Sequence, residues 1–159
     1  MCPVTLLATL PDSIKTTFNP AFFKKYILPD FYEFVEELHK WGKKVVSHTD
    51  GENKALWELY LEAKIDILEA VAVYPMVSES MKEIIEKMGN RATLWGLVDS
   101  IALLENSMSL NDFHKYIEEL IGFAKKYPVI LGISDTSPTD MNIDRLLYIR
   151  DRLKKENKK

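Results

Sequence analysis

A histidine and an aspartate stand two residues apart at the end of a short β-branched segment. His48 and Asp50 follow Val45 and Val46, and Gly51 comes next. In an extended backbone, residues two apart point to the same face. An imidazole and a carboxylate on one face are suited to bind a divalent metal ion or to move a proton. This segment is therefore the first candidate site.

Acidic residues also stand at the ends of the other predicted strands. Asp12, Asp99 and Asp135 each come just after an apolar segment, and Glu69 lies near the end of another. Parallel strands of α/β folds bring their carboxyl ends to one edge of the sheet, where binding sites form. Taken singly, an aspartate in such a place also serves as a turn former or a helix N-cap. Each of these residues keeps that alternative interpretation.

Apolar segments alternate with amphipathic segments along the chain. Asn19 and Asn111 are expected to cap helices, and Pro29 is expected to kink the first helix. His39 and His114 fall within predicted helices, and we interpret them as surface or satisfied core residues. The predicted strands are 3–10, the segment that ends at 48, 65–73, 92–98 and 128–134. The predicted helices are 19–41, 52–63, 80–88, 111–126 and 142–155.

The repeated strand–helix order, with continuously apolar strands, favours a parallel sheet covered by helices. No glycine-rich phosphate loop follows any strand, which argues against a nucleotide-binding Rossmann domain or a P-loop. A (β/α) barrel remains, but a complete barrel needs eight strands and about 250 residues. The prediction is an α/β fold in one domain over residues 1–159. That domain is a partial TIM-type barrel of about five parallel strands with covering helices.

Composition excludes several classes of protein. The 159 residues are 47% hydrophobic and 28% charged, which suits one globular domain with a real core. The net charge of −3 suggests neither nucleic acid nor an anionic membrane as a partner. Cys2 is the single cysteine, so neither an internal disulfide nor a cysteine cluster for zinc is expected. The absence of a long apolar run and of a signal-peptide pattern predicts a cytoplasmic protein.

Four segments of the chain resemble, in the same order, motifs of the uroporphyrinogen decarboxylase superfamily. They are 19–29, 42–51, 93–96 and 130–135, with Pro138 and 143–149 beyond the last. The resemblance covers nearly the whole chain, corresponds to the second half of the family's barrel and is closest to the corrinoid-dependent methyltransferase branch. It implies a methyltransferase domain acting in corrinoid-linked methyl transfer. The runner-up is a carboxy-lyase, as a fragment of a porphyrinogen decarboxylase.

The resemblance also implies the residues of a site. In the methyltransferase branch a His-x-Cys motif and a second cysteine on the last strand commonly bind zinc. His48 matches the histidine, Asp50 stands at the first cysteine, and Ser134 stands near the second, with Asp135 beside it. Without the thiolates, we expect a metal site of His48, Asp50 and Asp135 that is weaker and less selective for zinc. The expected catalytic residues are these three and Asp12.

Five strands do not close a barrel, and they leave two open edges that proteins normally cover. We expect a homo-oligomer, a separate chain that supplies the first strands, or a fragment of a longer protein. A corrinoid protein is a further partner that the resemblance implies. The alternative to an enzyme is a non-catalytic half-barrel that serves as an assembly subunit or is a relic. The absent cysteines and the absent first strands favour that alternative.

Overall fold

The computed structural model of the chain describes residues 4–10 and 19–156, and the side chains of 4–10 are not included. Five strands form one sheet, and all neighbouring strands are parallel. In chain order, which is also their order in the sheet, they are β1 (Val4–Leu10), β2 (Lys44–Thr49), β3 (Ile67–Val71), β4 (Thr93–Val98) and β5 (Val129–Ile133). The sheet is not closed. The prediction of a partial TIM-type barrel is confirmed.

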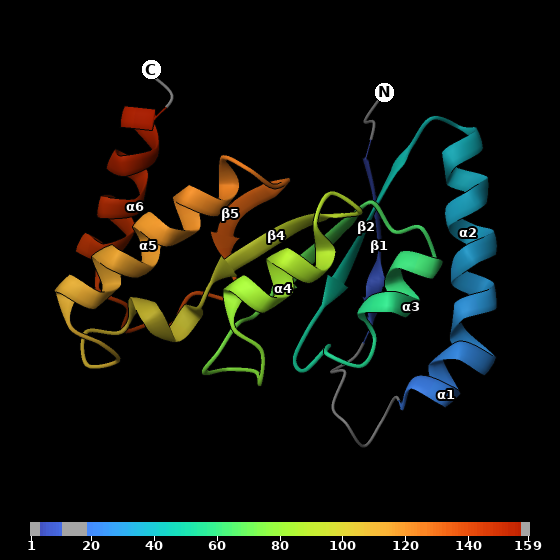
Figure 1. Cartoon of the computed structure of the whole chain (residues 1–159), viewed down its shortest axis with the longest axis horizontal. Coiled ribbons are helices and arrows are strands. Elements are labelled where there is room, and N and C mark those ends of the chain that lie inside the picture. The colour runs from blue at the N-terminus through green and yellow to red at the C-terminus, as the bar shows by residue number, and fades with distance from the viewer. Residues whose placement is uncertain (1–3, 11–18, 157–159) are drawn as a thin grey trace.

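Helices connect the strands and cover the sheet. They are α1 (Pro20–Phe22), α2 (Leu28–Lys40), α3 (Trp57–Glu62), α4 (Met81–Met88), α5 (Leu110–Ala124) and α6 (Ile143–Glu156). A π-helical segment, η1 (Phe23–Ile27), joins α1 to α2, and a 3-10 helix, η2 (Ser100–Leu103), precedes α5. In Figure 1, α3 and α4 lie in front of the strands, while α2 and α5 flank them on either side. In nearly all known folds, sequential parallel strands are joined by right-handed crossovers, which place successive helices on one face of the sheet.

The two faces of the sheet differ in burial. Leu68 and Leu94 are partners in register, and both are buried in the core together with Ile84 of α4. On β4 and β5, Trp95 and Ile130 are also partners in register, yet their exposed fractions are 38% and 42%. In a closed barrel, side chains of other strands would fill the space in front of this face. One face is thus packed by helices, and the other is partly open.

The helix caps follow local sequence signals, with one correction. Asn19 caps α1 as predicted, because its Oδ1 accepts a hydrogen bond from the Phe22 amide at 2.8 Å. The prediction that Asn111 caps the helix at 111–126 was wrong. Ser109 is the cap of α5, and its Oγ accepts from the Asp112 amide at 3.1 Å. The Ser109 hydroxyl also donates to the Asp112 carboxylate at 2.7 Å, which favours the earlier start.

Three further predictions need adjustment. The kink expected at Pro29 takes the form of the π-helical segment η1 just before it, since a proline ring does not fit against a regular preceding turn. The helix predicted at 52–63 begins only at Trp57, after a turn around Asn53. The strand predicted at 65–73 is shorter, Ile67–Val71.

Within the described part of the chain, no helix combines the length and apolar character that a membrane crossing requires.

Candidate functional site

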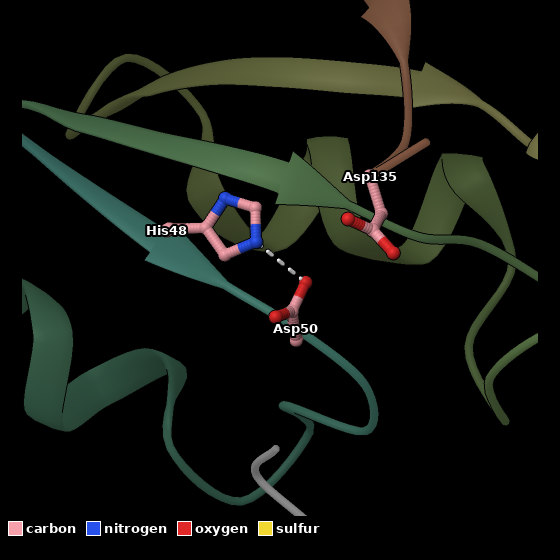
Figure 2. Close-up of side chains that lie close together, drawn as sticks. All are labelled: His48, Asp50 and Asp135. Carbon is pink, nitrogen blue, oxygen red and sulfur yellow. Dashed lines mark ion pairs between the residues drawn. The ribbon is translucent and has the colours of Figure 1, made fainter. Parts of the chain in front are cut away.

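The candidate site lies at the carboxyl ends of β2 and β5, as the parallel sheet predicts. His48 is the last residue but one of β2, Asp50 follows that strand, and Asp135 follows β5 by two residues. Figure 2 shows the three side chains turned toward one another from these strand ends. The structure thus brings together the three residues expected to bind a metal. The fourth expected residue, Asp12, lies outside the described residues.

Both nitrogens of the His48 ring contact carboxylates. Nε2 lies 2.8 Å from Oδ1 of Asp50, the ion pair drawn in Figure 2. Nδ1 is in hydrogen-bond contact with Oε2 of Glu69 on β3, the register partner of His48. The His48 side chain is 19% exposed, so the ring is shielded on most sides but reachable from the mouth of the half-barrel. Its two contacts fix the plane of the ring.

Glu69 was noted among the acids near strand ends but was not one of the expected site residues. A bulge aims it at His48: the register of β3 with β4 shifts between Leu68 and Val71, and Ala70 has a positive φ of 61°. Such bulges redirect side chains beside functional sites. The hydroxyl of Thr49 also donates to the Glu69 carbonyl at 2.9 Å, which ties the bulge to the neighbouring strand. No sequence signal marks this bulge, and hence the contact was missed.

The loop that carries Asp50 is held by a buried amide. The Asn53 side chain is 2% exposed, and its Nδ2 donates to the carbonyls of Thr49 at 2.9 Å and Gly51 at 3.0 Å. Its Oδ1 accepts from the hydroxyl of buried Tyr60 at 2.9 Å. Asn53 is a positioning residue that sequence reasoning missed. Its position three residues after an acid and two after a glycine is a common turn pattern, which is why it attracted no attention.

Asp135 reaches the site through an unusual backbone conformation. It has a positive φ of 59°, a region that aspartate and asparagine tolerate better than most residues. The preceding Ser134 anchors it: this residue is 1% exposed, its amide donates to the Val98 carbonyl at 2.8 Å, and its hydroxyl donates to the Val71 carbonyl at 2.6 Å. The hydroxyl at 134 is therefore occupied by the sheet. Asp135, which is exposed, is the residue that faces His48.

Negative charge dominates the surroundings of the imidazole. Burial of the ring disfavours its charged form, but the contact with Glu69 and the charges of Asp50, Glu69 and Asp135 outweigh this effect, so the pKa of His48 lies above its ordinary value. Three carboxylates around one histidine leave a surplus of negative charge. A divalent cation would neutralise that surplus.

Asp99 ends β4 but belongs to a different environment. It is 2% exposed, and its Oδ1 accepts from the Val73 amide at 3.2 Å. Burial raises the pKa of Asp99 to about 7, despite that hydrogen bond. Its own amide donates to the hydroxyl of Tyr116 at 3.1 Å, and that hydroxyl in turn contacts the Leu97 carbonyl. Asp99 thus lies apart from the group that surrounds His48.

The three residues at the mouth offer a donor set that fits a divalent cation. One nitrogen of His48 and one oxygen each from Asp50 and Asp135 all lie within 4.8 Å of one another. In tetrahedral coordination at about 2.0 to 2.2 Å, two ligands of one zinc ion lie about 3.3 to 3.6 Å apart. The three side chains would therefore have to move closer together to bind zinc. The set contains no thiolate, so it suits metals that accept nitrogen and oxygen ligands. Without a metal, the same residues are suited to acid–base chemistry.

The fold and this site define an open (β/α) half-barrel with a histidine–carboxylate group at the carboxyl ends of its strands. The family model of uroporphyrinogen decarboxylase (URO-D) matches residues 6–154. The chain therefore belongs to the uroporphyrinogen decarboxylase family.

One solved structure, a methyltransferase from Methanosarcina mazei, is similar in fold, with a TM-score of 0.65 and 20% sequence identity. The similarity covers 94% of this chain and 42% of that one. This chain thus spans less than half of the length of that structure. A comparison with curated proteins found no match.

Proposed function

We propose that this chain is the metal-binding half of a barrel that acts in corrinoid-linked methyl transfer. The observation that carries the proposal is the placement of His48, Asp50 and Asp135 around one point at the mouth of the half-barrel. The family and the fold of the Methanosarcina mazei methyltransferase support it. A corrinoid-carrying protein is the partner that this function requires, and zinc is the metal that we would test first.

The chain's own residues have defined parts in this proposal. Nδ1 of His48 donates to Glu69, which leaves Nε2 as the ring nitrogen that would bind a metal beside Asp50 and Asp135. Asn53 holds the loop that presents Asp50. His48, Asp50 and Asp135 would hold a divalent ion, which would lower the pKa of a coordinated thiol or water and so supply a nucleophile at neutral pH. Because Asp50 replaces a thiolate, we expect weaker binding of zinc than at a cysteine-containing site.

The second candidate is a half-barrel subunit without catalysis, completed by a second copy or by another polypeptide. The observation that favours it is the open sheet, in which β1 and β5 are edges and Trp95 and Ile130 are exposed in front of the strands. Such edges are normally paired or covered in folded proteins. The third candidate, a fragment of a porphyrinogen decarboxylase, has less support, because the described residues that line the pocket at the mouth include two aspartates and no lysine or arginine.

The test measures metal binding and methyl transfer on matched variants. Titration calorimetry with ZnCl2 and mass-spectrometric metal analysis are applied to the wild type, His48→Ala, Asp50→Ala and the control His114→Ala, whose ring stacks on Tyr148 at 3.9 Å. Methyl transfer is followed by the absorbance of methylcobalamin, with the chain assembled with the partner that completes the barrel. We expect both site variants to lose metal and activity, while the control keeps both. The proposal fails if both site variants bind metal and transfer methyl groups as the wild type does.

A further inference from the structure

A small pocket opens beside the candidate metal site. It is lined by two carboxylates of that site and by an apolar wall. Its volume is about 210 Å³. Taking about 30 Å³ per water in the liquid, this is room for roughly seven waters, less than the pockets of drug-sized ligands offer. The residues that line it are Asp50, Gly51, Ala70, Ala72, Met76, Val77, Ser134 and Asp135. A compact ligand with a few carbon atoms fits this space, and a tetrapyrrole does not.

The apolar part of the pocket is made by short side chains. Gly51, Ala70 and Ala72 carry no more than a methyl group each, and Met76 and Val77 add larger apolar surface. The polar hydroxyl of Ser134 is directed to the Val71 carbonyl rather than left for a ligand. A ligand therefore meets hydrocarbon over most of its body.

The polar end of the pocket carries negative charge. Asp135 is exposed, and it lines the pocket at a point that a ligand can reach. Asp50 lies beside it, and no lysine or arginine is among the described residues that line the pocket. A carboxylate or sulfonate ligand would meet like charge here, whereas a cation would meet opposite charge at short range. The pocket thus combines a small apolar wall with an acidic end.

We propose that this pocket binds small organic cations of the alkylammonium class and rejects small carboxylates and sulfonates. The hydrocarbon body would lie against Ala70 and Ala72, and the ammonium group would lie at Asp135. The inference deepens the proposed function, since it names the class of small molecule that reaches the same site. The charge preference itself does not require a bound metal.

The test uses three probes of similar size and different charge: isobutylammonium, isobutanol and isobutyrate. Each is titrated into the full, isotopically labelled chain at about pH 7.5, where the amine is protonated, and amide shifts are followed by NMR. We expect isobutylammonium to bind about tenfold or more tightly than isobutyrate, with isobutanol between them. The largest shifts should fall on the amides of Gly51, Ala70 and Ala72. Equal or tighter binding of isobutyrate would overturn the inference, as would shifts confined to another part of the molecule.

Two variants with matched controls separate charge from space. Asp135→Asn removes the charge, and asparagine tolerates the positive φ at this position, so the preference for the cation should vanish. The control Asp140→Asn, outside the pocket, should keep that preference. Ala72→Leu should block all three probes, while Ala55→Leu at an exposed position should block none. Retention of the cation preference in Asp135→Asn would contradict the inference.

A parallel titration with ZnCl2 keeps the two proposals distinguishable. Binding of isobutylammonium without binding of zinc would overturn the proposed metal function and leave the charge preference standing. Binding of zinc without a preference for isobutylammonium over isobutyrate would overturn the charge preference and leave the proposed metal function standing. Amide spectra of every variant confirm that the fold is retained, so loss of binding is read only from folded protein.

Discussion

Histidine–carboxylate groups stand at both ends of the sheet, and they differ in how their charges are balanced. At the amino end, Asp66 accepts from Nε2 of His39 at 2.7 Å, from Nζ of Lys44 at 2.6 Å and from the Val45 amide at 2.9 Å. Burial alone would raise the pKa of Asp66, but the contacts with Lys44, Val45 and His39 hold it below its ordinary value. One carboxylate is thus surrounded by donors.

At the carboxyl end the ratio is reversed, because one histidine meets three acids. His48 contacts Asp50 and Glu69 and lies near Asp135. A balanced group of the first kind joins α2 to the starts of β2 and β3 and therefore stabilises the fold. An unbalanced group of the second kind would be neutralised by an external cation, as the proposed function requires. The comparison teaches that the two histidines differ in the charge balance around them and not in residue type.

The largest expected effect comes from exchanging the two histidines for alanine. His48→Ala should lower the affinity for zinc by about 100-fold or more, because it removes a ligand and not merely a supporting contact. His39→Ala should leave that affinity unchanged, because its ring lies at the other end of the sheet. Titration calorimetry on both variants checks this. Equal losses in the two variants would erase the distinction between the ends.

Next in size is the effect of removing the carboxylate at the amino end. Asp66→Ala leaves Lys44, His39 and the Val45 amide without their acceptor, and we expect a loss of about 2 to 3 kcal/mol in the free energy of unfolding. Zinc affinity should not change. Urea denaturation gives the first quantity and calorimetry the second. A variant with wild-type stability but weakened zinc binding would assign Asp66 to the wrong group.

A third prediction concerns Asp99, which is near the carboxyl ends but buried away from the metal group. A pKa of about 7 means that the folded protein keeps a proton that the unfolded chain releases near pH 4. Stability should therefore fall as pH rises, by about 2 kcal/mol between about pH 5 and pH 7.5. Asp99→Asn should flatten this decline, as measured by urea denaturation at both pH values. An unchanged decline in the variant would place its origin elsewhere.

The smallest predicted effect belongs to Glu69. Glu69→Gln keeps an acceptor for Nδ1 of His48 but removes a negative charge, and we expect zinc affinity to fall by about tenfold. Glu118→Gln is a suitable control, since Glu118 lies on α5 and pairs with Arg152. Calorimetry compares the two variants. A loss in the control as large as that in Glu69→Gln would point to a general effect of charge rather than to support of His48.

Much of the fold follows from the sequence because strands and helices leave distinct periodic patterns. The five strands and the order of elements were predicted in this way. The meeting of His48, Asp50 and Asp135 was expected from the edge at which parallel strands end and from the resemblance to the family. The interpretation of His39 as a satisfied residue is also confirmed, since it is paired with Asp66.

The remainder depends on tertiary contacts or on competing local signals. The approach of Glu69 requires the bulge at Ala70, and the support from Asn53 requires the distant hydroxyl of Tyr60. Neither leaves a periodic pattern. The cap of α5 was misplaced by two residues because Ser109 and Asn111 are both good capping residues, and only the carboxylate of Asp112 decides between them.

The central claim is that the carboxyl end of the sheet, and not the amino end, binds a divalent cation. The most direct measurement is anomalous diffraction at the zinc edge from crystals soaked in ZnCl2. We predict one peak between Nε2 of His48 and the carboxylates of Asp50 and Asp135. A peak beside His39 and Asp66, or none at all, would contradict this account.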